Sequence, residues 1–285
     1  MDSTQTARRG LFLVLGKIVA RGTRMHSRSP SVSFANCGEE EEKLLVSFER
    51  LCENYGVLPV DVLLKTDRLP IALSFMHLED AQGIRILDYG CGSGKTAVYF
   101  AQRGAEVVGF DASLSSIRVA VRRAHVNGCR DDARFVVATA EKLPFQDGYF
   151  DFVFGHGVLY YVDDRSGYGE EILRVLRPGG KAIFCESIVG NPLIDASRQV
   201  LKTLVDCRTR GDPLRLGAIE QQFSMASDLA CIRVNMLGML KRVLGWRTRS
   251  ARLAVTTLKR LDRRLLRWFP SLKNYCSEVV IVVTR

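Results

Sequence analysis

The sequence predicts an α/β protein with a doubly wound, mostly parallel sheet. Short apolar runs typical of buried strands alternate with helical patterns of roughly 10–15 residues through the middle of the chain. A glycine-rich stretch, "DYGCGSG", follows the first of these runs, as at a tight turn from a strand into a helix. Right-handed crossovers would bring the carboxyl ends of the parallel strands to one edge of the sheet, where ligands bind.

The expected elements follow one another in regular order. Helical spacing of apolar residues predicts helices over residues 39–52, 60–76, 95–103, 114–127, 169–176 and 191–207. Apolar and β-branched runs predict strands over residues 84–87, 105–111, 133–140, 150–157, 181–187, 228–235 and 277–284. A Pro-Gly-Gly turn at 178–180 is expected to lead into the strand at 181–187.

The composition is that of a globular protein with free thiols. The chain has 285 residues, of which 47% are hydrophobic and 25% charged. Its eight cysteines form no C-x-x-C pair, which favours a reducing, cytoplasmic compartment, and its four scattered histidines predict no metal site. No apolar run approaches the roughly 18–20 residues that are needed to cross a bilayer.

The net charge of +10 is concentrated in two peripheral segments. Near the start, residues 3–38 hold six Arg or Lys and no acid. We expect residues 1–38 to be a basic extension that is poorly ordered or forms a surface helix. A transit-type presequence, or a true start at Met25, are the alternatives.

The second basic segment lies near the C-terminus. Residues 238–273 hold eleven Arg or Lys against a single acid, Asp262. We expect residues 39–285 to form one domain, in which 236–273 are a basic helical insertion or cap between the last two strands.

Three classes of nucleotide-like ligand are held by glycine-rich turns of this kind, and the loop Ile86–Thr96 discriminates between them. A P-loop for a nucleoside triphosphate would need glycine at position 89, which is Tyr89. A dinucleotide turn would need a third glycine at position 95, which is Lys95. Asp88 would also repel a pyrophosphate, whereas an acid suits a ligand that carries an amine and no phosphate.

The loop resembles the first motif of the class I S-adenosylmethionine-dependent methyltransferases, [DE]-x-G-x-G-x-G. The stretches "ATAEKLPFQDGYFDFVF" and "RVLRPGGKAIFCE" resemble later motifs of this family, in the right order and spacing, so that the resemblance covers about 84–186. It is closest to the type 11-like small-molecule or lipid subgroup. It implies a Rossmann-like sheet with an antiparallel last strand, and S-adenosyl-L-methionine as the cofactor.

The resemblance also implies which residues bind the cofactor. An acid that matches Asp111, at the end of the second strand, binds both ribose hydroxyls in the family, and Thr139 stands where an acid often receives the adenine amine. The full set of implied cofactor-binding residues is Asp88, Gly90, Cys91, Gly92, Gly94, Asp111, Ala112, Thr139, Ala140, Glu141 and Gly155.

Candidate catalytic residues follow the fourth expected strand, in "GHGVLYYV". Methyl transfer needs alignment of the acceptor and exclusion of water, and it needs a base only if the acceptor must lose a proton. His156 is the candidate base or positioning donor, and a packed histidine beside the cofactor is the alternative. Tyr160 and Tyr161 are candidate walls of the acceptor pocket, or core residues. Glu186 could orient an acceptor hydroxyl or cap a turn.

The acceptor is expected to be a small molecule or lipid-like. The stretch "ESIVGNPLIDASRQVLKTLVDCRTRGDPL" resembles a methyltransferase subgroup of that kind, and it contributes Glu186, Asn191, Pro192, Arg208, Thr209, Pro213 and Leu214 to the match. RNA or protein methylation is one alternative. A non-catalytic, cofactor-binding partner protein is another. The sequence predicts no oligomeric state.

The basic segment predicts an amphipathic helix that could touch an anionic membrane surface through residues 238–273. One face carries Leu258, Leu261, Leu265 and Trp268, and the other carries Lys259, Arg260, Arg263, Arg264 and Arg267. The alternative is that the apolar stripe packs on the domain and the charges are only solvated. No aromatic stacking platform accompanies the charge, which disfavours nucleic acid.

Overall fold

The computed structural model describes residues 68–76, 78, 81–162, 167–192, 195–196, 214–236 and 249–285, without the side chains of 249–256 and 259. All of them belong to one compact unit, Leu44–Arg285. The basic extension 1–38, the helix expected at 39–52 and most of the helix expected at 191–207 lie outside the described residues.

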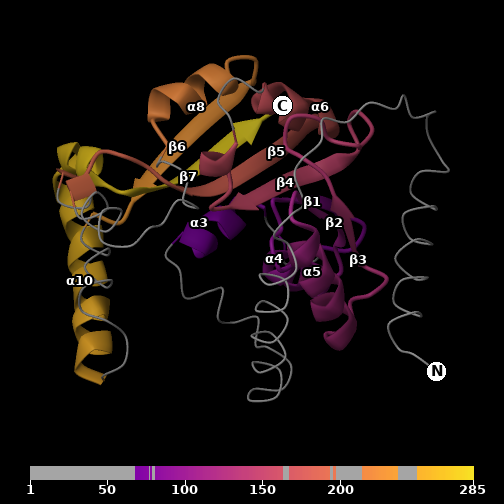
Figure 1. Ribbon diagram of the computed structural model, residues 1–285. Coiled ribbons are helices and arrows are strands. Elements are labelled where there is room, and N and C mark those ends of the chain that lie inside the picture. The colour runs from indigo at the N-terminus through magenta and orange to yellow at the C-terminus, as the bar shows by residue number, and fades with distance from the viewer. Residues whose placement is uncertain are drawn as a thin grey trace. The chain divides into compact units, whose positions relative to one another are not determined.

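A seven-stranded sheet with the order β3-β2-β1-β4-β5-β7-β6 forms the centre of this unit (Figure 1). The strands are β1 Arg85–Tyr89, β2 Glu106–Asp111, β3 Ala133–Val137, β4 Phe150–His156, β5 Leu176–Ser187, β6 Asp228–Val234 and β7 Glu278–Thr284. The first five pair in parallel, and β7 pairs antiparallel with both β5 and β6. The predicted doubly wound, mostly parallel sheet with an antiparallel last strand is therefore confirmed.

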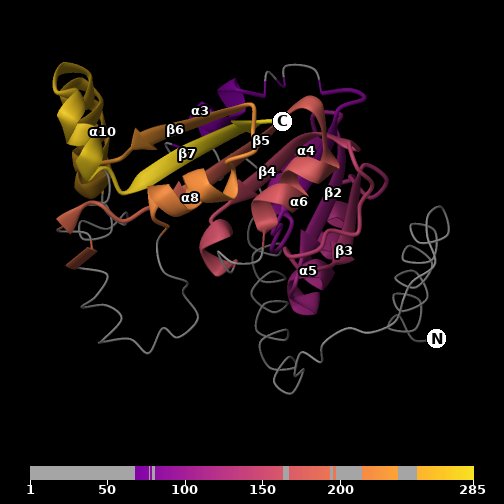
Figure 2. The same cartoon turned by 90° about the horizontal axis from the view of Figure 1, so that it is seen from above.

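Helices cover both faces of the sheet (Figure 2). The described helices are α3 Arg68–Ser74, α4 Lys95–Ala101, α5 Leu114–Val126, α6 Tyr168–Val175, α8 Leu216–Gln222 and α10 Arg249–Trp268, with the short 3-10 helices η2 Leu159–Tyr161 and η4 Pro270–Tyr275. Apolar residues of α3, α4 and α5 share one core cluster with one face of the sheet. Residues of α6 and α8 share the other cluster, so each face buries its own apolar layer.

Two local details differ from the sequence prediction. The Pro-Gly-Gly segment lies inside β5, which already begins at Leu176, and the pairing of β4 with β5 jumps there from Phe150↔Leu176 to Phe152↔Lys181. The extra residues form a bulge in which Gly179 has a φ of +74°, a conformation that glycine adopts without strain. Helix α8 was not expected; it is only seven residues long and contains Gly217, so its periodic signal is weak.

The ligand-binding edge lies where the parallel strands end. The register pairs Tyr89 with Gly155 and His156 with Cys185, so β1, β4 and β5 end together. Because β7 is antiparallel, it begins at this edge, with Glu278 opposite Ser187. Helix α10 follows β6 in the chain and contacts mainly η4. Among the residues that the structure describes, no helix is both long and apolar enough to cross a membrane.

Candidate functional site

The glycine-rich loop between β1 and α4 forms the first part of the site. Gly90, Gly92 and Gly94 have φ angles of +65°, +49° and +72°, in the left-handed region that residues with a Cβ rarely adopt. Backbone hydrogen bonds close the turn, from Cys91 N–H to the Phe110 carbonyl at 2.8 Å and from Gly94 N–H to the Cys91 carbonyl at 2.9 Å. The conformation therefore depends on the alternating glycines.

These glycines do not have the same surroundings. A Cβ on Gly90 would lie 2.2 Å from Val158, and a Cβ on Gly94 would lie 2.8 Å from Ala120, so both allow close packing. Gly155, also predicted to touch the cofactor, leaves room for Val158 and the Phe184 ring. A Cβ on Gly92 would meet nothing within 4 Å. Gly92 is thus where the open backbone of the loop can be approached by a ligand.

Asp111, at the end of β2, holds the loop from the neighbouring strand. Its Oδ2 accepts the Gly92 N–H at 3.0 Å and its Oδ1 accepts the Ser113 N–H at 2.9 Å. Each carboxylate oxygen keeps acceptor capacity for a further hydroxyl donor. Ala112, beside it, is exposed. The position agrees with the predicted role toward a ribose, which stays a prediction.

Asp88 places a second carboxylate beneath the loop. It is only 2% exposed, and burial raises its pKa to about 7; a hydrogen bond from the Ala97 backbone opposes the shift and the charge of Asp111 adds to it. Its Oδ2 has no hydrogen-bond partner among the described residues. Cys91, next in the loop, is buried, and burial raises the pKa of its thiol well above the usual value. Two acids so close together favour a cationic ligand over an anionic one.

The sequence did not single out Arg123, whose side chain holds the glycine-rich loop from helix α5. Arg123 lies in α5, is 5% exposed, and its Nε donates to the Ser93 carbonyl at 2.7 Å. The available signal was that Arg123, unlike the exposed Arg122 before it, stands three residues after Ala120 on the buried face of the helix. Lys95 is exposed at the start of α4 and carries no part of this geometry.

The loop after β3 carries the residues predicted to meet the adenine. Thr139 and Glu141 are exposed and Ala140 is half-buried. The start of the loop is tied to β2, because Ala138 N–H donates to the Asp111 carbonyl at 3.2 Å. The loop therefore begins next to the ribose-binding candidate, as the predicted assignment requires.

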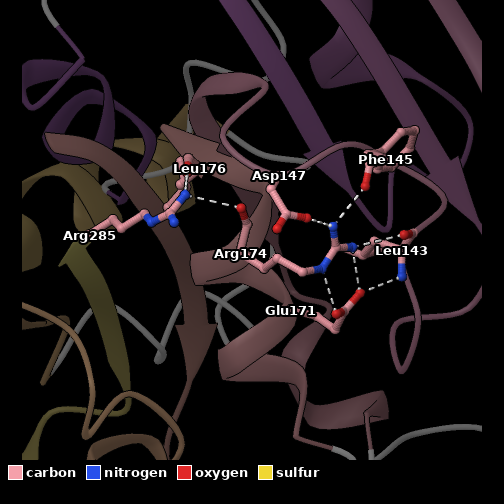
Figure 3. Close-up of polar contacts among 7 residues, drawn as sticks. All are labelled: Leu143, Phe145, Asp147, Glu171, Arg174, Leu176 and Arg285. Atoms are coloured by element: carbon pink, nitrogen blue, oxygen red, sulfur yellow. Dashed lines mark hydrogen bonds and ion pairs between the residues drawn. The ribbon is translucent and has the colours of Figure 1, made fainter. Parts of the chain in front are cut away.

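A polar clasp anchors the other end of this loop (Figure 3). The Arg174 guanidinium donates to the carbonyls of Leu143 and Phe145 and to the carboxylates of Asp147 and Glu171, at 2.6–3.0 Å. Glu171 also accepts the Leu143 N–H at 2.8 Å. These contacts lower the pKa of Glu171, with the Arg174 hydrogen bond as the largest cause. The clasp fixes the loop to α6, and the sequence motif alone did not reveal it.

His156 and Tyr160 lie on the segment that leaves β4. His156 is exposed at the end of the strand, yet the surrounding protein, followed by the charge of Arg68, lowers its pKa to about 4. Tyr160 is half-buried, and its hydroxyl lies 3.5 Å from where a Cβ on Gly157 would be. The rings of Tyr160 and Tyr161 lie 4.4 Å apart. The structure places both candidates at the edge, with His156 as a neutral imidazole.

Glu186 caps the turn that carries these residues. Its Oε1 accepts the N–H groups of Val158 and Leu159 at 2.8 and 3.0 Å, and the side chain is fully buried. Burial raises the pKa of Glu186 to about 7, and the two backbone hydrogen bonds oppose the shift. Of the two roles expected for Glu186, the cap of a turn is the one with contacts in the structure.

The comparisons with known proteins agree with this geometry. Residues 87–184 match the family described as "Methyltransferase domain". The match spans the glycine-rich loop, Asp111, the clasp and the exit of β4. This segment is thus similar to a methyltransferase domain.

Relatives of the methyltransferase domain carry the same designation. The methyltransferase GfsG of Streptomyces halstedii is 31% identical over 154 residues, which are 52% of this chain and 55% of the relative. A demethylmenaquinone methyltransferase of Clavibacter sepedonicus is 41% identical over 105 residues, 36% of this chain and 41% of the relative. The chain thus spans about half the length of these relatives.

Solved structures share the fold. An S-adenosylmethionine-dependent methyltransferase from Mesorhizobium loti superposes with a TM-score of 0.54 at 20% identity, covering 78% of this chain and 100% of that one. At this identity the likeness concerns the fold, which extends beyond the matched family segment to β6 and β7.

Proposed function

We propose that the protein is an S-adenosylmethionine-dependent methyltransferase that methylates a small-molecule or lipid-like acceptor. One observation carries the proposal: the Gly92 N–H donates to the Asp111 carboxylate at 3.0 Å. In a loop that holds phosphates, the backbone N–H groups face the ligand. Here this donor is already used by an acid, with buried Asp88 beneath it, so the loop suits a cationic ligand without phosphate.

The chain's own groups fit this cofactor. Asp111 can accept from two ribose hydroxyls, and the open backbone at Gly92 can be approached closely. The orphaned oxygen of buried Asp88 suits a nearby positive charge. Thr139, Ala140 and Glu141 would line the adenine side. The bound cofactor supplies an activated methyl group on its sulfonium.

Catalysis then depends on alignment. The segment that leaves β4, capped by Glu186, would position the acceptor and exclude water. His156, with a pKa of about 4, is neutral at physiological pH and can accept a hydrogen bond from the acceptor. So low a pKa makes it a weak general base, which favours a positioning role over full proton abstraction.

The relatives support a small acceptor, since one of them is named for demethylmenaquinone. To test the assignment, the protein is incubated with methyl-labelled cofactor and a cell lysate, which is then separated into lipid, small-molecule, RNA and protein fractions. We expect label in the lipid or small-molecule fraction. Label in RNA or protein supports the alternative acceptors, and binding of the cofactor with no labelled product supports a non-catalytic role.

A second part of the proposal is that α10 touches an anionic membrane surface. Leu261 is 45% exposed and Trp268 68% exposed, while Asp262 is the buried residue among the side chains of α10 that the structure describes. The apolar stripe is therefore only partly covered, because Leu258 and Leu265 are half-buried. Four arginines flank it, all exposed: Arg260, Arg263, Arg264 and Arg267. An exposed Trp and Leu beside a cationic face suit a bilayer interface.

Vesicle sedimentation tests this surface. The protein should pellet with anionic phosphatidylserine vesicles at low salt, and much less with zwitterionic ones, because about 1 kcal/mol per basic residue is screened by salt. Replacing the four arginines of α10 by Gln should abolish pelleting. The matched control replaces four other exposed arginines by Gln, namely Arg122, Arg130, Arg134 and Arg215. If both quadruple variants pellet equally, the membrane proposal fails.

The location proposed for the protein is cytoplasmic. The described cysteines, Cys91, Cys129, Cys185, Cys231 and Cys276, are all free thiols. Burial raises the pKa of Cys185 to about 12, so this thiol stays protonated and unreactive. Free thiols are what a reducing compartment maintains.

A further inference from the structure

A buried cation lies at the end of the binding edge opposite the glycine-rich loop. Arg68 is the first residue of α3, and α3 packs on β5 and β7 through buried Leu69 and Ala72. The Arg68 side chain is 12% exposed. Glu278, whose carboxylate lies 3.4 Å from the Arg68 Nε, begins β7 opposite Ser187 at the end of β5. Since β5 pairs with β4 at Cys185↔His156, the guanidinium lies near the end of β5, one strand away from His156.

The hydrogen-bonding capacity of Arg68 is largely unused. Its Nε lies 3.4 Å from the Glu278 carboxylate, and neither this nitrogen nor Nη1 has a hydrogen-bond partner among the described residues, although both are buried. Glu278 is itself engaged, because the same Oε2 accepts a short hydrogen bond from Asn235. A buried guanidinium with unmade hydrogen bonds is costly. A further oxygen acceptor is therefore expected.

We propose that Arg68 and the neighbouring His156 form a subsite for an anionic oxygen group of the methyl acceptor, a carboxylate or a phosphate. The planar guanidinium matches either group with two parallel hydrogen bonds. The neutral imidazole adds a donor without competing charge. The subsite lies at the carboxyl ends of the strands, on the acceptor side. It deepens the proposed function and rests on it.

Substitutions at Arg68 and Glu278 test the subsite, because they should change anion binding in opposite directions. Removing the arginine charge in Arg68→Gln should weaken anion binding. Removing the competing carboxylate in Glu278→Gln should strengthen it, because Glu278 is the carboxylate that forms an ion pair with Arg68. A matched control is Arg177→Gln: Arg177 pairs with Asp151 at 2.7 Å, near the start of β4 and β5, at the other edge of the sheet.

The experiment follows the His156 imidazole signal by NMR while benzoate, inorganic phosphate or uncharged benzamide is added at constant ionic strength to protein saturated with S-adenosylhomocysteine. We expect a saturable shift with benzoate or phosphate and none with benzamide. Arg68→Gln should weaken binding at least tenfold, Glu278→Gln should tighten it severalfold, and Arg177→Gln should leave it unchanged. The anion that binds more tightly assigns the group as carboxylate or phosphate.

Equal shifts with benzamide, or unchanged binding in Arg68→Gln, would overturn the proposal. If Arg68→Gln does not fold, the Glu278→Gln variant provides the test. Anion binding that is unchanged or weaker in Glu278→Gln would then contradict the proposal. Calorimetry with S-adenosylhomocysteine on the same samples distinguishes a failure of the subsite from a failure of the proposed function. Cofactor binding without anion binding removes the subsite alone, whereas no cofactor binding removes the proposed function.

Discussion

The two ends of the sheet edge that carries the proposed site differ in the groups that define it. On the β1–β2 side, backbone groups define the site: a glycine loop closed by its own hydrogen bonds and by Asp111. On the β5–β7 side, buried charged side chains define it, with Arg68 and Glu278 forming an incompletely paired cluster near the end of β5, one strand away from His156. A site that is defined by backbone groups suits a ligand that does not vary. A site made of side chains can be altered by a single substitution, so we expect specificity to reside there.

The largest effect is expected at the link between the loop and β2. Asp111→Ala removes the acceptor of the Gly92 N–H and the predicted ribose contacts. Cofactor binding should weaken by about 2–3 kcal/mol, roughly 30- to 150-fold, since charged hydrogen bonds are left unmade. Calorimetry with S-adenosylhomocysteine measures the change. Asp131→Ala, at an exposed acid, is the control and should bind normally; an Asp111 variant that binds equally well would refute the backbone-built site.

A smaller effect is expected on stability where the two sides meet. A Cβ on Gly155 would lie 2.5 Å from the Phe184 ring. Gly155→Ala should lower the free energy of unfolding by roughly 1–3 kcal/mol through overpacking. Gly217→Ala is the control, because nothing lies within 4 Å of its Cβ and α8 should gain about 0.5–1 kcal/mol. Denaturant unfolding compares them, and similar midpoints would show that β4 tolerates the extra methyl group.

The smallest effect concerns the protonation of the His156 imidazole. His156 should titrate near its pKa of about 4, and Arg68→Gln should move the midpoint upward, because the guanidinium charge lowers it. Since the unfolded chain takes up this proton near the ordinary value of 6.5, acidification from pH 6.5 toward 4 disfavours the folded state through His156. NMR of the imidazole follows the titration. A wild-type midpoint between 6 and 7 would contradict the described surroundings.

The position of Asp111 beside the glycine-rich loop was predictable because its signals are local. The alternating glycines and Asp88 are adjacent in the chain, and Asp111 ends the next strand, so pattern and order indicated that they meet. Their role toward a cofactor stays a prediction. The expected strands from β1 to β7 are confirmed for the same reason: each is a continuous apolar run. The strand β5 was expected to begin only after the Pro-Gly-Gly segment, because Pro and Gly favour turns, whereas the pairing of Leu176 with Phe150 depends on the fold.

The β5–β7 side was less predictable because it is assembled from distant segments. Arg68 and Glu278 are brought together only by the packing of α3 on the antiparallel last strand. Glu186 lies in a recognised motif, yet its role as a cap of Val158 and Leu159 depends on a fold contact between β5 and the exit of β4. Likewise, the stripe of α10 could be read from its spacing, but not that the helix buries Asp262.

The most direct measurement of the central claim is a calorimetric comparison of S-adenosylhomocysteine, NAD and ATP on the wild-type protein and on Lys95→Ala. The loop directs the Gly92 N–H to a carboxylate and uses no lysine, so only S-adenosylhomocysteine should bind, and Lys95→Ala should change its affinity less than about twofold. Binding of NAD or ATP without S-adenosylhomocysteine, or a large loss of affinity in Lys95→Ala, would contradict the account.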